Sequence, residues 1–130
     1  MISLYMKNKV FTKYIGHLIK NKTITHKEAC MLYRINNNCY PTKKNKTKYS
    51  NIGPIHISQE WGSSITHIRE SFKYFVEENL LTPHYYFGSK KYDTLAEAKK
   101  TLPVKSIEIR YEITETKTLK NMLKKASKTS

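Results

Sequence analysis

The strongest constraint on the fold is the segment "ISQEWGSSITHIRESFKYFVEENLL", from Ile57 to Leu81. Its second half repeats apolar residues at helical spacing, and these are Ile68, Phe72, Phe75, Val76, Leu80 and Leu81. Such a stripe predicts an amphipathic helix from Ser64 to Leu81 that buries its apolar face. Before it, Gly62 and Ser63 interrupt the pattern and predict a tight turn. The segment therefore predicts two helices joined by a turn.

Two further helices are expected upstream. Apolar residues recur at i, i+4 and i+8 between Val10 and Ile19, which indicates a wide buried stripe. Thr25 and Glu28 then match the S/T-x-x-E capping box, so a second helix should start at Thr25. We expect it to end within residues 36–38, three consecutive asparagines, because their side chains compete for backbone hydrogen bonds.

Beyond Leu81 the pattern becomes strand-like. The runs "PHYYFG" and "KKYDT" flank a Gly-Ser turn and predict a β-hairpin. Asp93 or Thr94 is then placed to cap a short helix that Pro103 ends. Imperfect alternation from Val104 to Ile113 predicts a longer strand, so the chain belongs to the α+β class.

The tail "TKTLKNMLKKASKTS" combines apolar residues at helical spacing with five lysines and no acid. This composition fits either a docked basic helix or a frayed tail. Because no cap or glycine stop is evident, we expect partial disorder outside a complex.

The charge balance points to a polyanionic partner. The chain has 24 Lys+Arg against 10 Asp+Glu, a formal net charge of +14, far more than solubility requires. Nucleic acid is the first candidate partner, an anionic membrane surface the second and an acidic protein the third. An inert basic surface is the plain alternative. Only three of the cations are arginines, which leaves few side chains suited to bidentate guanine contacts.

No enzyme signature stands out. Cys30 and Cys39 lack CxxC spacing, and the five histidines lack HxH or HExxH spacing, so we expect no metal site, cofactor or catalytic residue. Glu97-Ala98-Lys99 matches half of a nuclease motif but lies on a predicted helix rather than a strand. Lysines interrupt the N-terminus too early for a signal peptide, and no stretch is long enough to span a membrane. We expect a cytoplasmic protein, or one in the host cytoplasm or nucleoid if it is viral.

The order of capped turn, glycine, Ser-Ser, helix, "EENLL" and hairpin resembles the winged helix-turn-helix family, most of all replication-initiation and regulatory proteins of plasmids and phages. Gly62 matches the turn glycine and Ser64 the capping serine. Asn79 replaces the usual late glycine and tolerates the left-handed conformation. The resemblance implies a winged helix-turn-helix core with a C-terminal hairpin, short helix and strand extension. The expected domain spans residues 1–92 and contains N-terminal helices, a basic loop at 41–54, the helix-turn-helix at 58–81 and the wing at 83–92. An extension at 93–114 is expected to pack on this domain, and a basic tail should follow at 115–130.

Three residues or stretches depart from the family pattern. Ile55 to Ile57 alternates like a brief strand, after which Ser58 would cap a first helix of only one turn before Gly62. Ile65 stands where a polar contact residue is common, although it can meet a thymine methyl. Glu70 puts a negative charge on the expected reading face, where it can accept from a cytosine amino group.

The resemblance implies that the helix from Ser64 enters the major groove of double-stranded DNA. The candidate contacts on this helix are Ser64, Ile65, Thr66, His67, Arg69, Glu70 and Lys73. The candidate phosphate contacts are Lys43, Lys44, Lys46 and Lys48 in the basic loop, with Lys90 and Lys91 at the hairpin.

The leading hypothesis is a non-enzymatic double-stranded DNA-binding protein of a mobile element or virus, either a transcriptional regulator or a replication accessory factor. One alternative is a small basic effector that inhibits an acidic host protein or a nucleic-acid-binding channel. Another is an RNA-binding module that stacks bases on Tyr85, Tyr86 and Phe87. DNA binding predicts lysines clustered beside Arg69 and Lys73, whereas an effector can carry them elsewhere. A homodimer is left open.

Overall fold

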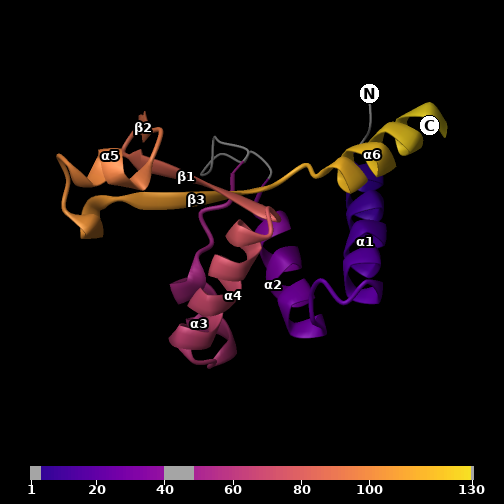
Figure 1. Cartoon of the computed structure of the whole chain (residues 1–130), viewed down its shortest axis with the longest axis horizontal. Coiled ribbons are helices and arrows are strands. Elements are labelled where there is room, and N and C mark those ends of the chain that lie inside the picture. Colours follow the sequence, from indigo (N-terminus) through magenta and orange to yellow (C-terminus); the bar gives the residue numbers. More distant parts are fainter. Residues whose placement is uncertain (1–3, 40–48, 130) are drawn as a thin grey trace. The chain divides into compact units, whose positions relative to one another are not determined.

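The computed structural model describes residues 4–39 and 49–129, and these form an α+β fold with a three-stranded antiparallel sheet (Figure 1). The predicted fold class is therefore confirmed, and the arrangement is compatible with a helix-turn-helix followed by a wing. The elements are α1 (Leu4–Lys20), α2 (His26–Asn36), α3 (Pro54–Trp61), α4 (Ile65–Glu77), β1 (Leu81–Phe87), β2 (Lys90–Tyr92), α5 (Leu95–Lys99), the 3₁₀ helix η1 (Val104–Ser106), β3 (Glu108–Ile113) and α6 (Lys117–Thr129). The four candidate lysines of the basic loop, Lys43, Lys44, Lys46 and Lys48, lie outside the described residues.

The chain divides into two compact units. Residues 1–30 and 115–130 form one, called here the helix-pair unit, and residues 31–114 form the other, the sheet unit. The helix α2 runs across the boundary between them. The expected extension at 93–114 thus shares a unit with the helix-turn-helix segment, whereas the first thirty residues group with the tail.

In the helix-pair unit, α6 packs against α1. The apolar stripe of α1 is buried as predicted, including Phe11 and Ile15. On α6, Leu119 is buried, and its backbone N–H donates to Thr116 Oγ1 at 3.3 Å, which caps the helix. The Thr116 hydroxyl donates to the Tyr14 hydroxyl at 3.2 Å. The expected disorder of the tail is therefore wrong: the missing cap is Thr116, and a buried leucine holds the helix in place.

The start of α2 is formed as predicted. The backbone N–H of Thr25 donates to Glu28 Oε1 at 2.8 Å, and that of Glu28 donates to Thr25 Oγ1 at 3.1 Å. These reciprocal bonds satisfy two of the unpaired N–H groups at the helix start. The helix ends at Asn36, within the predicted asparagine run.

The segment before the turn is a helix, so the expected strand at residues 55–57 is wrong. Pro54 occupies the first position of α3, where its fixed φ favours helix and its missing N–H costs nothing. Ser58 lies inside α3 instead of capping it, and its hydroxyl donates to the Ser63 carbonyl at 2.6 Å. With eight residues α3 has about two turns, and it ends at Gly62, whose φ of 62° is left-handed.

The next helix, α4, buries Ile68, Phe72 and Phe75 as predicted. It ends at Glu77 rather than Leu81, because Asn79 takes the expected left-handed conformation at φ 59° and stops the helix. Leu81 is buried, but it belongs to β1. Val76 was expected in the buried stripe and is instead 37% exposed.

The sheet has the strand order β2-β1-β3, with both pairings antiparallel. The predicted hairpin is confirmed as β1 and β2, and the turn residue Gly88 has a φ of 59°. Thr94 caps α5 by accepting from the Glu97 N–H at 3.1 Å. The predicted strand start at Val104 is wrong, since residues 104–106 form η1 and β3 begins at Glu108.

Both ends of the α3–α4 pair are attached to this sheet. Ahead of α3, Ser50 pairs with Tyr111 of β3 through two backbone hydrogen bonds of 2.8 Å. After α4, the chain enters β1, the neighbouring strand. The Phe72 ring meets the Tyr111 ring edge-on, with centroids 5.1 Å apart. The α3–α4 segment is thus anchored at each end to adjacent strands.

Candidate nucleic-acid interface

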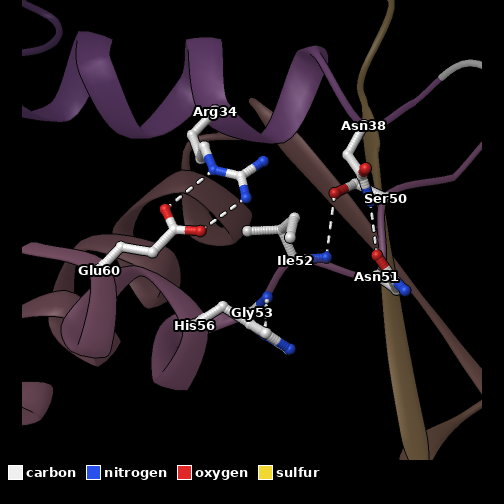
Figure 2. A network of polar contacts seen from close by, with 8 residues as sticks. All are labelled: Arg34, Asn38, Ser50, Asn51, Ile52, Gly53, His56 and Glu60. Carbon is white, nitrogen blue, oxygen red and sulfur yellow. Dashed lines mark hydrogen bonds and ion pairs between the residues drawn. The ribbon is translucent and has the colours of Figure 1, made fainter.

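A network of polar contacts fixes the entry to α3 (Figure 2). The Arg34 guanidinium on α2 contacts both carboxylate oxygens of Glu60 on α3, at 2.9 and 2.6 Å. The Ile52 N–H donates to Ser50 Oγ, and the Gly53 N–H donates to His56 Nδ1, each at 3.1 Å. These bonds hold the backbone that leads into α3 and α4. His56 lies on a helix rather than on a strand.

The Arg34–Glu60 pair is bidentate, which adds geometric specificity. The hydrogen bond between the two side chains raises the pKa of Arg34 above its usual value and lowers that of Glu60. Both side chains are partly exposed, at 34% and 41%, so solvent screens the attraction. The pair positions α2 against α3 more than it stabilises the fold.

The expected reading face on α4 is open to solvent. Ser64, Thr66, His67, Arg69, Glu70 and Lys73 are exposed, and Ile65 is half-buried. Ser64 stands at the N-cap, but its side chain makes no capping hydrogen bond. The structure thus brings together all seven candidate residues from this helix at one exposed surface.

This surface carries little net charge. On α4, Arg69 and Lys73 are balanced by Glu70 and Glu77, and Lys73 lies 3.9 Å from Glu77. The described part of the sheet unit, residues 31–39 and 49–114, contains nine Lys+Arg and eight Asp+Glu, which gives a net charge of +1. Among the described residues of the sheet unit, lysines therefore do not cluster beside Arg69 and Lys73.

Most of the positive charge belongs to the helix-pair unit instead. Its residues include eleven lysines and two glutamates, a net charge of +9, and neither α1 nor α6 contains an acidic residue. The five lysines of α6 fall within an arc of about 140° at 3.6 residues per turn, opposite the buried Leu119. All five are exposed, and they are Lys117, Lys120, Lys124, Lys125 and Lys128.

Lysines of both helices meet at a groove between α1 and α6. Its volume is about 470 Å³, and Lys9, Lys13 and Lys125 line it together with the apolar side chains of Met6, Val10, Met122 and Ala126. Concave surfaces lined by one sign of charge concentrate the electrostatic potential. Sequence reasoning missed this surface as a site, although lysine runs without an acid were its signal.

The hairpin lysines lie beside aromatic rings. Lys90 Nζ is 4.9 Å from the centre of the Tyr92 ring, and Lys91 Nζ is 5.8 Å from that of Tyr49. Both lysines are exposed and follow the turn at Gly88. They can reach a polyanion, but they add only two charges.

The three aromatic residues expected to stack RNA bases do not share one face. Side chains alternate along β1, so Tyr86 points to the opposite side from Tyr85 and Phe87. The Arg110 guanidinium lies over the Tyr86 ring at 4.6 Å, and Tyr86 is buried. A continuous stacking platform is therefore not formed by these rings.

Among the described residues, no group of three or more His, Cys, Asp or Glu side chains is placed to hold a metal ion. Cys30 is exposed. Burial raises the pKa of Cys39 to about 11, and its thiol donates to the Ile35 carbonyl at 3.3 Å. Cys39 is thus held as a neutral thiol rather than as a nucleophile. Glu97 and Lys99 lie on α5, as expected.

Comparisons with protein-family models, with curated proteins and with solved structures found no match to this chain. In the part of the chain that the structure describes, no helix has both the length and the apolar character needed to cross a membrane.

Proposed function

We propose that this chain is a non-enzymatic double-stranded DNA-binding protein that holds phosphates with the lysines of α1 and α6 and contacts bases with α4. The observation that carries the proposal is the lysine surface of the helix-pair unit, with a net charge of +9. A role as a transcriptional regulator or replication accessory factor of a mobile element or virus follows from the resemblance of its helix-turn-helix segment.

Charge of this kind favours a phosphate backbone as the ligand. Each lysine that neutralises a phosphate releases condensed counterions, and this release supplies most of the sequence-independent affinity for DNA. The lysines of α6 repeat along one face of a helix of thirteen residues, about 20 Å long. A surface of that length can follow several consecutive phosphates of a duplex.

The α3–α4 pair supports a duplex rather than another polyanion. A two-turn helix, a left-handed glycine and an exposed second helix are the parts of a helix-turn-helix. Thr66 and His67 are exposed in the first turn of α4, which is the part of a recognition helix that meets base edges. Base reading by this nearly neutral surface adds specificity, whereas the helix-pair unit supplies affinity.

An acidic protein is the second candidate partner. It is favoured by the small net charge of the described part of the sheet unit, since an effector does not need lysines on the unit that holds a reading helix. The groove between α1 and α6 combines lysines with an apolar floor, and an acidic amphipathic segment would match both.

Duplex binding measured by fluorescence anisotropy from about 50 to 300 mM salt tests the proposal. The key variant replaces Lys117, Lys120, Lys124 and Lys128 with alanine. Its slope of log affinity against log salt should be smaller than that of the wild type by about 3 to 4. Replacement of Lys99, Lys100 and Lys105, exposed lysines of the sheet unit, provides the control and should change the slope by less than about 1.

Base contacts need a separate variant. Replacing Thr66 and His67 with alanine should reduce the preference for a selected sequence and leave the salt slope unchanged. Wild-type protein that shows no duplex binding at about 50 mM salt contradicts the proposal and favours the acidic protein partner.

A further inference from the structure

An apolar groove lies in the sheet unit, between α4 and the segment that joins β2 to β3. Its volume is about 680 Å³. Its lining includes Ile55 of α3, Val76 of α4, Tyr85 of β1, Val104 of η1 and Ile109 of β3. The groove is therefore built from helices and strands that are distant in sequence but belong to one unit.

The groove gathers the apolar side chains that the fold leaves exposed. Among the described residues, the exposed large apolar side chains are Tyr5, Ile55, Val76, Phe87 and Val104. Three of these five line the groove, with exposed fractions of 53% for Ile55, 37% for Val76 and 64% for Val104. Contiguous apolar surface of this kind usually marks an interaction site.

The sheet explains why this surface stays open. Pro83 and Tyr85 lie on the same face of β1, and they pair with Tyr111 and Ile109 of β3. Phe72 of α4 covers that face at Tyr111. Figure 1 shows that both strands continue beyond α4 towards α5, and there Tyr85 and Ile109 are only half-buried. Between α4 and α5, whose Leu95 also lines the groove, part of this apolar sheet face thus lacks a covering element.

The charges around the groove select the kind of partner. Arg69 and Lys73 line it from α4 together with Glu77, which lies 3.9 Å from Lys73, and Lys105 follows Val104 and is exposed. A helix with an apolar stripe and acidic flanks would bury the stripe against Tyr85 and Ile109 and place carboxylates near these cations. The cost of covering Arg69 is offset only by a partner that supplies an acid.

Neither a second copy nor DNA fits this groove as well. A second copy also carries a net charge of +14, and repulsion between two such chains opposes association. The phosphate backbone of DNA makes polar and ionic contacts and gains nothing from Ile55, Val76 and Val104.

We propose that this groove binds an acidic amphipathic helix of another protein, with Ile55, Val76 and Val104 gripping its apolar stripe and Arg69 contacting its acidic flank. This proposal does not rest on the proposed DNA binding. Since Arg69 and Lys73 belong to both surfaces, a helix seated here would cover one flank of α4 and compete with any base contacts made from that flank.

The test uses the full chain and a fluorescein-labelled synthetic helix with leucines on one face and glutamates on the others. Methyl NMR of the protein is recorded during the titration. The resonances of Ile55, Val76, Val104 and Ile109 should shift, and those of Val10 in the helix-pair unit should not. A peptide with lysine in place of every glutamate should produce no shifts.

Variants assign the binding to the groove. Val104→Asp should weaken peptide binding by about tenfold or more, because it puts a charge against the apolar stripe. Val104 is well exposed, so the change should not disturb folding, and Ile55→Asp provides a second variant. Tyr5→Asp, in the helix-pair unit, is the matched control and should leave the affinity unchanged.

Three results overturn the proposal. One is a set of shifts centred on Met6, Val10 and Met122, which would place the acidic helix on the lysine groove between α1 and α6. Another is the appearance of the Ile55 and Val104 shifts with rising protein concentration and no peptide, which would assign the groove to a second copy. The third is the absence of shifts at saturating peptide concentrations.

Discussion

The helix-pair unit carries most of the positive charge, whereas the sheet unit carries the more varied surface. Residues 1–30 and 115–130 carry a net charge of +9 on two simple amphipathic helices. The described part of the sheet unit carries +1 and holds the turn, the α4 surface, the sheet and the apolar groove. The contrast teaches that overall basicity does not locate a reading surface, because attraction to phosphates and recognition of shape need different side chains.

The largest expected effects are losses of stability on truncating a core residue in each of the two units. Phe75→Ala removes a fully buried ring from the sheet unit and should cost about 3–5 kcal/mol. Leu119→Ala in the helix-pair unit should cost about 2–3 kcal/mol. The fluorescence of Trp61, the one tryptophan of the chain, can report urea unfolding of the sheet unit, in which it lies. The Trp61 transition should move far more for Phe75→Ala, and equal shifts would mean that both units unfold together.

A second comparison uses one glycine from each unit. Gly62 ends α3 with a φ of 62°, and Gly62→Ala should cost about 1–2 kcal/mol since a side chain is strained there. Gly16 lies within α1, with nothing within 4 Å of an added Cβ. Gly16→Ala should therefore stabilise the protein by about 0.5–1 kcal/mol. Thermal unfolding of both variants measures this contrast, and two losses of equal size would contradict it.

A third comparison concerns helix starts. Thr25→Ala removes the capping box of α2 and should cost about 1 kcal/mol. Ser64 makes no side-chain capping bond at α4, so Ser64→Ala should change stability by less than about 0.5 kcal/mol. Chemical unfolding separates the two. A large loss for Ser64→Ala would show that its hydroxyl is needed for folding and complicate its use as a DNA-contact variant.

The smallest expected effect involves the surface pair of the sheet unit. Arg34 lowers the pKa of Glu60, so the stabilisation is present at neutral pH and is lost as the pH falls through the lowered pKa of the folded state. Glu60→Gln should lower the melting temperature slightly at pH 7, and the difference should shrink below about pH 4. A difference that persists at low pH would point to lost hydrogen bonds rather than lost charge.

Local patterns predicted much of this fold. The capping box at Thr25, the stripe of α4, the left-handed Asn79 and the hairpin turn each depend on neighbouring residues, and each is present. The errors arose where one local signal overrode another or where the tertiary covering of a helix decided. Alternation at 55–57 suggested a strand, but Pro54 and the His56 ring favour a helix start. Val76 follows the apolar period of α4 but lies where no element covers it.

The candidate site was predictable only in part. The period of α4 was enough to place Thr66, Arg69 and Lys73 on an open face. The groove beside them was not predictable, since Ile55, Ile109 and Val104 come together only through the pairing of β1 with β3. The location of the charge was visible in the lysine runs near both ends of the chain, but their union in one unit depends on the packing of α6 against α1.

The packing of α1 against α6 also sets an order of events on the ribosome. Between Lys20 and Lys117 the ribosome must add nearly a hundred residues, which takes roughly 5–20 s. During that time the apolar stripe of α1, with Phe11 and Ile15, has no α6 to cover it. A nascent or truncated chain therefore exposes the apolar face of α1, a surface of the kind that chaperones bind. The two lysine-bearing helices pack together only when synthesis reaches the last residues of α6.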